Sequence, residues 1–444
     1  MLTTATTTPL VTPSDPDWDA TRQVFNLALD LQPAAIALPR DVGEVIAAVE
    51  HARRRGLRVA PQATGHNAAA YGPLEDALLV DVRRLQEVSI DPSTQRVRVG
   101  AGVKWERVVP RLSEHGLAAL HGSSPDVGIA GYSLGGGMGW LARKHGLQAN
   151  SVTAIELVTA DGVHRRVDAT HEPDLFWALR GGNGNYGVVT AIEFRVFPVE
   201  ELYAGAMFFP FERTGDVLGA FTELSLGAPE ELMAWTTLLQ FPDVPFVPEP
   251  FRGGSFAVLM GAYLGDESEG RELLRGIRDL GPAMDTFAMV PPVALSELAM
   301  DPPEPLPVMM TTAQLDAVPV DELTRAVGPG SGSPLAMIQI RQMGGALERT
   351  APDAGARATL PGAYSLIALG VPADEGLAAT IGGYLDAIDR AVEPHRCGEY
   401  PNFVERPADA SAFFDAGTWA RLRAVKAAYD PDELFRGNHY IPAA

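Results

Sequence analysis

Three glycine-rich segments carry the residues of this sequence that are best suited to chemistry. The first, ATGHN, puts His66 in a turn of small residues, in a chain with nine histidines. The second runs from His121 to Gly146, and the third, LRGGNGNYGVVT, runs from Leu179 to Thr190. Glycines at this density let backbone N–H groups converge on a ligand, which suits a pyrophosphate or a flat ring system. One such turn alone is more often structural, but three together favour a ligand site.

The spacing of these glycines disfavours two common nucleotide sites. Gly128, Gly131 and Gly135 do not fit the G-x-G-x-x-G pattern of a dinucleotide site, and the phosphate-binding pattern G-x-x-x-x-G-K-[ST] is absent. The chain has one cysteine, Cys397, and lacks His-Glu-x-x-His and similar metal spacings. We therefore expect neither an intramolecular disulfide framework nor a metal site.

Composition limits the class of protein. The chain has 444 residues, 46% hydrophobic and 20% charged, which is enough for two or three globular domains. Its formal net charge of −21 repels phosphate backbones and anionic lipids, so we expect neither nucleic acid nor a membrane as a partner. The first residues lack the basic and apolar regions of a signal peptide, and no long apolar run occurs. We expect a soluble, cytoplasmic protein.

The part of the chain before Pro198 reads as a mixed α+β unit. Apolar residues at helical spacing predict helices at 42–55, 105–112 and 174–180. Short or alternating apolar runs bounded by turn residues predict strands at 57–61, 77–82, 154–160 and 191–197, and a strand pair joined by an Asp-Pro turn at 88–100.

After Pro198 the pattern changes to long strand-like runs that alternate with helices. The runs lie at 203–211, 234–241, 256–264, 335–343 and 363–370, and the helices include 270–281 and 377–392. We expect one large, mostly antiparallel sheet backed by helices. The proline-dense segment 291–307 cannot form regular structure and is either a connecting loop or a lid.

Five motifs stand in a fixed order along the chain. They are ATGHN, SSPDVGIAGYSLGGGMGWLARKHGL, ELVTADG, DLFWALRGGNGNYGVVT and, near the C-terminus, YDPDELFRGN. This set resembles the FAD-linked oxidases of the vanillyl-alcohol-oxidase superfamily, in the berberine-bridge-enzyme-like branch. The resemblance implies an α+β fold, with a PCMH-type FAD-binding domain of two small α/β subdomains and a substrate domain with a large antiparallel sheet backed by helices. We place the FAD-binding domain at 1–198, the substrate-binding domain at 199–398 and a C-terminal segment that returns to the FAD domain at 399–444.

The resemblance implies that FAD is bound covalently through His66. In the family the histidine of this turn holds the 8α-methyl group of the flavin, and an imidazole is a suitable nucleophile near neutral pH. The competing interpretation is a turn histidine that is hydrogen-bonded to backbone. Many members add a cysteine tether at the position that Ser124 occupies here. A serine hydroxyl lacks the nucleophilicity of a thiolate, so we expect a single tether and no cysteinyl link.

The resemblance also implies further FAD contacts in the glycine-rich segments and near the C-terminus. They are Thr64, Gly65, Asn67, Ser124, Val127, Gly128, Gly131, Gly135, Gly136, Gly139, Gly146, Val158, Asn185, Gly187, Val188, Asn402, Asn438 and Tyr440. Val127 stands where a small aliphatic residue goes with dioxygen access in this branch. It favours an oxidase over a dehydrogenase.

The resemblance suggests Tyr400, in the segment EYPNF, as the catalytic base. A tyrosine has an unperturbed pKa near ~10, so it acts as a base only if positive charge or hydrogen bonds lower that pKa. Arg341 is a candidate helper, and Gln339 shares its strand face, opposite Ile338 and Ile340. The competing interpretation of Tyr400 is a half-buried packing residue. The glutamate base of the plant alkaloid enzymes has no acidic counterpart in AYSLIALG.

We expect an oxidase that takes hydride from an alcohol, an amine or a secondary-metabolite intermediate and reduces dioxygen to hydrogen peroxide. The predicted partners are a small organic substrate and dioxygen, in bacterial secondary metabolism, and the oligomeric state stays open. Two alternatives remain: a flavin-dependent dehydrogenase with another electron acceptor, and a member that catalyses a cyclisation with a structural flavin.

Overall fold

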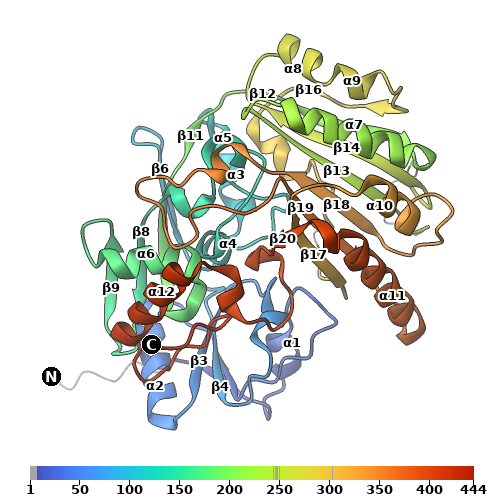
Figure 1. Ribbon diagram of the computed structural model, residues 1–444. Helices are drawn as coiled ribbons and strands as arrows, with labels where there is room; N and C mark the ends of the chain where they lie inside the picture. Colours follow the sequence, from blue (N-terminus) through green and yellow to red (C-terminus); the bar gives the residue numbers. More distant parts are fainter. Residues whose placement is uncertain (1–7, 244, 246–248, 250, 303) are drawn as a thin grey trace.

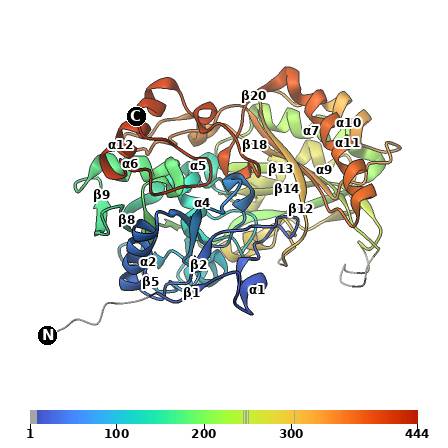
Figure 2. The same ribbon diagram turned by 90° about the horizontal axis from the view of Figure 1, so that it is seen from below.

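The computed structural model describes residues 8–243, 245, 249, 251–302 and 304–444. It is an α+β fold with sheets of four, five, two and nine strands. In Figure 1 the N-terminal and C-terminal parts of the chain lie together, and the large sheet with its helices lies above and to the right. Figure 2, seen from below, separates these two halves of the molecule. The fold class predicted from the sequence is confirmed.

The four-stranded sheet has the order β1 (Leu10–Val11), β2 (Ala35–Ala37), β4 (Ala77–Asp81) and β3 (Arg58–Gln62), and its last three strands run parallel. Helix α2 (Val42–Arg55) packs on it through Val45, Ala48 and Val49. Asp41 caps the start of α2 by accepting a hydrogen bond from Glu44 N, and Gly56 ends it in the left-handed conformation. These local signals explain why this helix was readable from the sequence.

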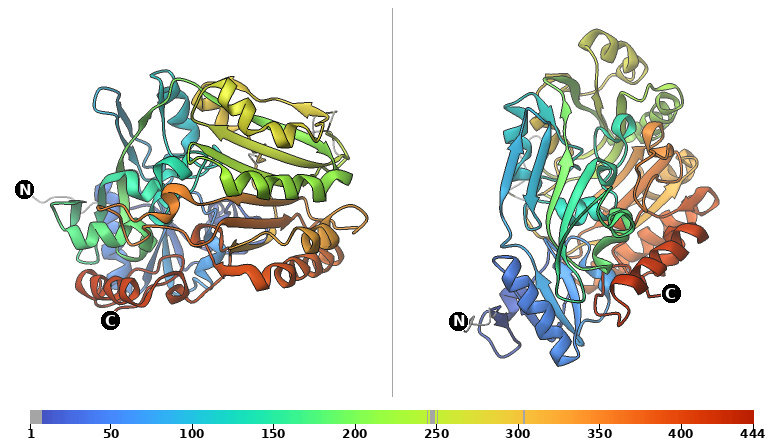
Figure 3. Two further views of the ribbon diagram at one scale, coloured as in Figure 1. Left: turned by 45° about the horizontal axis from the view of Figure 1, so that its top comes forward. Right: turned by 90° about the vertical axis from the view of Figure 1, so that its left-hand side faces the viewer.

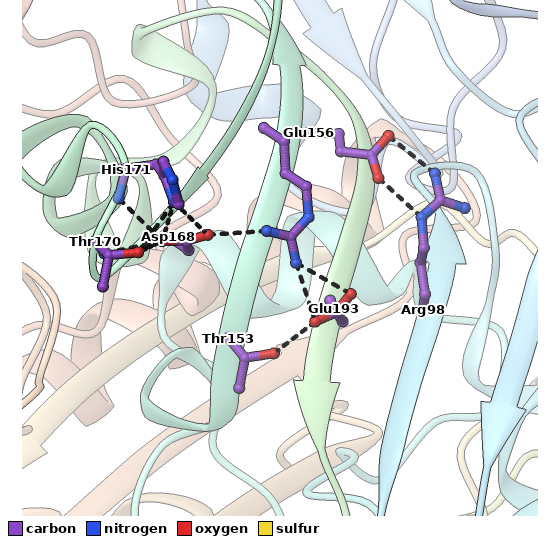
Figure 4. Close-up of polar contacts among 8 residues, drawn as sticks. Arg98, Thr153, Glu156, Asp168, Thr170, His171 and Glu193 are labelled. Carbon is purple, nitrogen blue, oxygen red and sulfur yellow. Dashed lines mark hydrogen bonds and ion pairs between the residues drawn. The ribbon is translucent and has the colours of Figure 1, made fainter. Parts of the chain in front are cut away.

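The five-stranded sheet is antiparallel, in the order β5 (Val88–Asp91), β6 (Arg96–Gly100), β10 (Val188–Arg195), β8 (Val152–Val158) and β9 (His164–Asp168). One face packs in the core, and the other carries a charged ladder (Figure 4). Arg98 donates to Glu156 at 2.8 and 2.9 Å, and Arg166 forms ion pairs with Asp168 and Glu193. Arg166 and Asp168 lie on the same strand, but the contacts of Arg98 with Glu156 and of Arg166 with Glu193 join different strands and support one strand register over its alternatives.

The nine-stranded sheet has the order β15-β12-β14-β13-β18-β19-β17-β20, and β16 also pairs with β12. Its strands are β12 (Leu202–Pro210), β13 (Leu232–Gln240), β14 (Ser255–Tyr263), β15 (Met284–Asp285), β16 (Ala288–Val290), β17 (Met309–Leu315), β18 (Met337–Gln342), β19 (Tyr364–Gly370) and β20 (Arg396–Gly398). Helices α7 (Thr214–Gly227), α10 (Val320–Val327) and α11 (Glu375–Val392) cover one face (Figure 3). The other face packs on Trp140 and Tyr400 and thereby meets the rest of the molecule.

The C-terminal segment returns to the first part of the chain, where α12 (Ala416–Tyr429) lies beside α6 (Pro173–Gly182) (Figure 1). Lys426 is fully buried and donates to Asp430 at 2.5 Å, Asn185 O at 2.6 Å and Phe435 O at 2.8 Å. Asp430 in turn accepts from the backbone N–H groups of Leu434 and Phe435. Because every polar partner is satisfied, this buried pair fixes the C-terminal motif against the third glycine-rich segment.

The remaining helices are short. They are α1 (Trp18–Arg22), α3 (Val109–Ser113), α4 (Ile129–Gly135), α5 (Ala142–His145), α8 (Glu267–Leu273) and α9 (Arg275–Arg278), and a two-stranded sheet joins β7 (Leu117–Ala118) to β11 (Phe197–Pro198). In the part of the chain that the structure describes, no helix has the length and apolar character needed to cross a bilayer.

Three predictions of regular structure need correction. The helix expected at 105–112 is split into a 3-10 turn (Trp105–Arg107) and α3, and that expected at 270–281 is split between α8 and α9. Segment 291–307, which we expected to be irregular throughout, contains a 3-10 turn at Pro292–Ser296, because prolines fit the first positions of a helical turn. Pro303 of this segment lies outside the described residues.

Candidate active site and cofactor cavity

A cavity lies where the two small sheets, the large sheet and the C-terminal segment meet. Its walls come from the turn after β3, the loop leading into α4, the third glycine-rich segment, strand β18 and the segment from Tyr400 to Glu405. All three glycine-rich segments therefore border one cavity. Local turns that are far apart in the sequence converge because the sheets fix their positions.

His66 lies on the wall of this cavity. Its Nδ1 is 2.8 Å from Thr64 Oγ1, and its ring stacks on Phe25 with the centroids 4.1 Å apart and an interplanar angle of 18°. Its Nε2 is 3.2 Å from Asp126 Oδ2 without the alignment of a hydrogen bond, so this buried nitrogen has no hydrogen-bond partner. The imidazole is bonded to side chains rather than to backbone, unlike the competing interpretation of a structural turn histidine.

Asp126 is buried beside His66, with its side chain 7% exposed. The Ser124 hydroxyl donates a hydrogen bond to Asp126 Oδ1. Burial raises the pKa of Asp126, but the contacts with His66 and Ser124 outweigh it, so the pKa is lowered overall. The carboxylate is therefore held ionised next to the imidazole.

Two glycines near the cavity differ in what they do. A side chain at Gly135 would place its Cβ 1.7 Å from Asn402 Oδ1, so this glycine lets α4 approach the C-terminal segment. A Cβ at Gly131 would meet nothing within 4 Å, so packing within the protein does not require a glycine there, and this position borders open space on the cavity wall.

Three asparagines tie the C-terminal segment to the cavity. Asn438 Nδ2 donates to Asn67 Oδ1 at 2.7 Å, and Asn67 Nδ2 donates to Val404 O at 3.1 Å. Asn402 Nδ2 donates to Tyr132 O at 3.0 Å. The side chains that the resemblance assigned to the cofactor thus also join the turn of His66 to the C-terminal motif.

Tyr400 also borders the cavity and is 1% exposed. Its Oη accepts a hydrogen bond from Gly137 N at 2.7 Å. Burial raises the pKa of Tyr400 above its usual value, and this effect exceeds the opposing influence of the Gly137 N–H, Arg357 and Arg341. The phenol is therefore protonated at neutral pH in this structure.

Arg341 lies beside Tyr400 on the cavity side of the large sheet. Its guanidinium lies 3.9 Å from the Trp235 ring centroid and 5.0 Å from that of Phe403, and its Nε donates to Gln339 Oε1 at 2.6 Å. Burial lowers its pKa to about 10, which leaves it charged at neutral pH. The expected alternation along β18 is confirmed, because Ile338 and Ile340 pack under the helices on the opposite face.

The structure brings most of the sequence-predicted residues to the cavity wall: Thr64, Gly65, His66, Asn67, Ser124, Val127, Gly128, Gly131, Gly187, Arg341, Tyr400, Asn402 and Asn438. It places the others behind this wall or away from it: Gly135, Gly136, Gly139, Gly146, Val158, Asn185, Val188, Gln339 and Tyr440. Gln339 reaches Arg341 and Thr237 instead. Asn185 accepts from Ile441 N at 3.0 Å and therefore fastens the C-terminus.

Sequence reasoning missed several residues of the site. Phe25 and Asp126 contact His66, Tyr132 lines the cavity, and Glu405 reaches its wall near Asn26. Asp126 was visible within the motif SSPDVG, but nothing in the spacing showed that it would meet the turn of His66. Phe25 lies outside every motif, so only the fold reveals its role.

The residues present fit an FAD. The glycine-bordered wall offers backbone N–H groups at close approach, which suits a pyrophosphate, and His66 places its imidazole on the same wall, with Nδ1 next to the Thr64 hydroxyl. No group of three or more His, Cys, Asp or Glu side chains arranged to hold a metal ion occurs among the described residues.

Comparison with protein families gives two matches. Residues 33–168 match the model described as an FAD binding domain, and residues 400–442 match the model described as berberine and berberine like. The first range contains His66 and Asp126, and the second contains Tyr400 and Asn438. The two matched segments are far apart in the sequence but border the same cavity.

Individual proteins give a consistent result. The chain is 34% identical over 233 residues to a xylooligosaccharide oxidase of Thermothelomyces thermophilus, covering 50% of this chain and 47% of that protein. It is 29% identical over 272 residues to the (R)-6-hydroxynicotine oxidase of Paenarthrobacter nicotinovorans, covering 61% and 58%. The chain thus spans about half the length of these curated relatives.

One solved structure extends the likeness over the whole fold. The Physcomitrella patens protein BBE-like 1 superimposes with a TM-score of 0.83 at 22% identity, covering 98% of this chain and 97% of that chain. This neighbour supports the fold, and the two family models add the motifs. Together with the cavity that these motifs border, they show that the chain contains an FAD binding domain and a berberine-like C-terminal segment, in the fold of a berberine-bridge-enzyme-like protein.

Proposed function

We propose that this protein is an FAD-dependent oxidase. It removes hydride from a carbon next to a hydroxyl or amine of a small organic substrate, and dioxygen receives the electrons and leaves as hydrogen peroxide. The observation that carries the proposal is the single cavity that joins His66 to Tyr400 and Arg341 across motifs of both family models.

In the proposed enzyme FAD is held by one covalent link to His66. The link is supported by the side-chain environment of the imidazole and by Ser124, a hydroxyl at the position of a second tether. When bound, FAD supplies a two-electron acceptor, and the chain binds, orients and moves protons around it. The limits 1–198, 199–398 and 399–444 are our proposed division into an FAD-binding domain, a substrate domain and a returning segment.

Tyr400 is the proposed acceptor of the substrate's hydroxyl or amine proton, at Oη. Four groups favour a phenolate there: the backbone N–H groups of Gly137 and Met138 and the guanidinium groups of Arg357 and Arg341. Arg341 also places a fixed positive charge on the cavity wall, where it stabilises negative charge that develops during the reaction. Because burial still raises the pKa of Tyr400, we expect activity to increase as the pH rises into the alkaline range.

The proposed substrates are neutral or weakly charged organic molecules. The relatives are named for a xylooligosaccharide and for a hydroxynicotine, one a sugar and the other an amine. Tyr132, Tyr400 and Phe403 on this cavity wall suit either a sugar ring or a heteroaromatic ring, because both stack on aromatic side chains. A role in bacterial secondary metabolism remains part of the proposal.

Two measurements test the proposal. The purified protein is precipitated with acid, and flavin colour must stay with the pellet. The protein is then supplied with sugars, alcohols and amines while dioxygen uptake and hydrogen peroxide are followed. Colour released to the supernatant contradicts the link to His66. Turnover with an artificial acceptor, but without dioxygen uptake, favours the dehydrogenase alternative, and product formation without net oxidation favours the cyclisation alternative.

A further inference from the structure

The buried Asp126 and the partly exposed Ser124 form a pair beside His66 that the proposed oxidation leaves unused. Asp126 Oδ2 lies 3.2 Å from His66 Nε2, and the Ser124 hydroxyl donates to Asp126 Oδ1. Asp126 is 7% exposed while the His66 side chain is 25% exposed, so the carboxylate lies behind the imidazole. A buried carboxylate in contact with a cavity histidine is the arrangement by which proteins orient an imidazole and accept its proton.

The imidazole is held from three sides. Phe25 stacks on its face at 4.1 Å, Thr64 Oγ1 lies 2.8 Å from Nδ1, and Asp126 stands at Nε2. A carboxylate at Nε2 favours the tautomer whose proton is on Nε2, because that proton points to the negative charge. The lone pair is then on Nδ1, next to the Thr64 hydroxyl and the cavity.

We propose that Asp126 is the residue that positions His66 for attachment to the flavin and accepts its proton, and that Ser124 orients Asp126. This inference rests on the proposed function, because it requires the link to His66. The lone pair on Nδ1 forms the new bond to the 8α carbon, and the Nε2 proton passes to Asp126.

The reaction balances with dioxygen as the oxidant. One C–H bond of the 8α-methyl group and one N–H bond of His66 break, and one N–C bond forms. The flavin gains the two electrons of the C–H bond, and dioxygen then takes two electrons and two protons and leaves as hydrogen peroxide. The linked flavin ends in its oxidised form, with one fewer hydrogen on the methyl carbon and one fewer on the imidazole.

Ser124 does more in this network than stand in place of a cysteine. It occupies the position at which many family members carry a second tether, yet here its hydroxyl points to the carboxylate that serves the first tether. The structure thus assigns both tether positions, His66 and Ser124, to the attachment of the flavin through His66. A serine is suited to this task because its hydroxyl donates to a carboxylate while its oxygen is a poor nucleophile.

The test uses Asp126→Asn, whose side chain has the same shape but does not accept a proton. The protein is produced without flavin, mixed with FAD in air, and sampled over time for flavin that stays with acid-precipitated protein. We expect attachment to slow by about 10² or more, the usual size of a general-base effect. Ser124→Ala should slow it by a smaller factor. Asp76→Asn, at an exposed carboxylate, is the matched control and should attach flavin at the normal rate.

A second variant separates chemistry from a folding defect. Asp126→Ala leaves space beside the imidazole, and added formate should restore part of the attachment rate, whereas a misfolded protein would not respond. Normal attachment in both Asp126 variants overturns the inference. If His66→Ala also keeps acid-stable flavin, the link itself is wrong, so failure of the inference and failure of the proposed function give different results.

Discussion

Two parts of the cavity wall hold their reactive groups in different ways. Around His66 (Phe25, Thr64, Ser124 and Asp126) the histidine is a quarter exposed and an acidic side chain contacts it directly. Around Tyr400 (Ser123, Trp235, Arg341 and Phe403) the tyrosine and the arginine are 1% and 5% exposed, and the acidic group of this region, Asp301, acts on Arg341.

This difference has a chemical consequence. The contacts of Asp126 with His66 and Ser124 outweigh its burial and keep it charged, whereas the burial of Tyr400 outweighs the Gly137 N–H, Arg357 and Arg341 and favours the neutral phenol. In the proposed enzyme, the residues around His66 serve a reaction that happens once, when the cofactor is attached. The residues around Tyr400 would act in every turnover, so their effect should depend on the charge of Arg341 and on the pH.

The largest expected effect comes from removing the histidine. In His66→Ala, acid-stable flavin should disappear completely, because no other nucleophile among the described cavity residues replaces the imidazole. Absorbance of the supernatant and of the pellet after acid precipitation measures this. Asn67→Ala is a useful comparison, since it changes the same turn and should weaken binding while keeping the link. Flavin retained in the pellet by His66→Ala would contradict the assignment.

The next effect is at Tyr400. Tyr400→Phe should lower kcat by ~10²–10⁴, the contribution of a positioned acid or base, with normal flavin content. The raised pKa of Tyr400 also predicts a pH profile for the unchanged enzyme. The reactive phenolate is scarce below the pKa, so kcat/KM should rise with pH through 8 to 10, and this rise should be absent in the variant. A profile that is the same in both proteins argues for a packing role.

Arg341 should have a smaller effect than Tyr400. Arg341→Met removes the positive charge but keeps an apolar chain on Trp235, and we expect kcat to fall by about 10², the usual loss for one stabilising group. Arg341→Lys should recover little, because an ammonium does not stack on the ring as a guanidinium does. Steady-state kinetics, with flavin content as a control, measures both. An unchanged kcat in Arg341→Met would show that the charge of Arg341 does not contribute to turnover, and Tyr400 would remain the proposed catalytic group of this region.

The smallest effect concerns stability rather than turnover. His439 is 3% exposed, and its Nε2 donates a hydrogen bond to Pro401 O at 3.0 Å, next to Tyr400 in the sequence. Burial lowers the pKa of His439 to about 4. The folded protein accommodates the neutral imidazole of His439 and disfavours the protonated one. The contribution of His439 to the free energy of unfolding is therefore complete above pH 6.5 and is lost as the pH falls toward 4. It amounts to ~3 kcal/mol at most. Urea unfolding of the protein and of His439→Gln at pH 7 and pH 5 tests this, and an equally steep loss in both would contradict it.

Much of the fold could be predicted because its signals are local. Helix α2 has an Asp cap, apolar residues at helical spacing and a terminal glycine, and strands β5 and β6 flank an Asp-Pro turn. The helix expected at 105–112 failed because Pro110 begins a new turn there instead of continuing the first. The apolar pattern was correct, but it could not show where one helix ends and the next begins.

The residues of the candidate site also separate into those that the sequence could predict and those that it could not. Thirteen of its predicted residues line the cavity. Many of them could be predicted because the local composition of a glycine-rich turn indicates a ligand site. Gly135 and Gly139 were assigned to the cofactor but serve close packing, against Asn402 and His121 O. A glycine needed by a ligand and a glycine needed by a neighbouring segment look alike in sequence, because both reflect the absence of a Cβ.

The sequence by itself determined the class of fold, the turns that border the cavity and the identity of His66 and Ser124, because these follow from residue types at short spacing. Only the tertiary structure decided that Asp126 meets His66, that Arg341 rather than Ile340 faces the cavity, and that burial raises the pKa of Tyr400. These facts depend on which distant segments meet and on how much water they exclude. The spacing of residues over a short stretch of sequence shows neither which distant segments meet nor how much water they exclude.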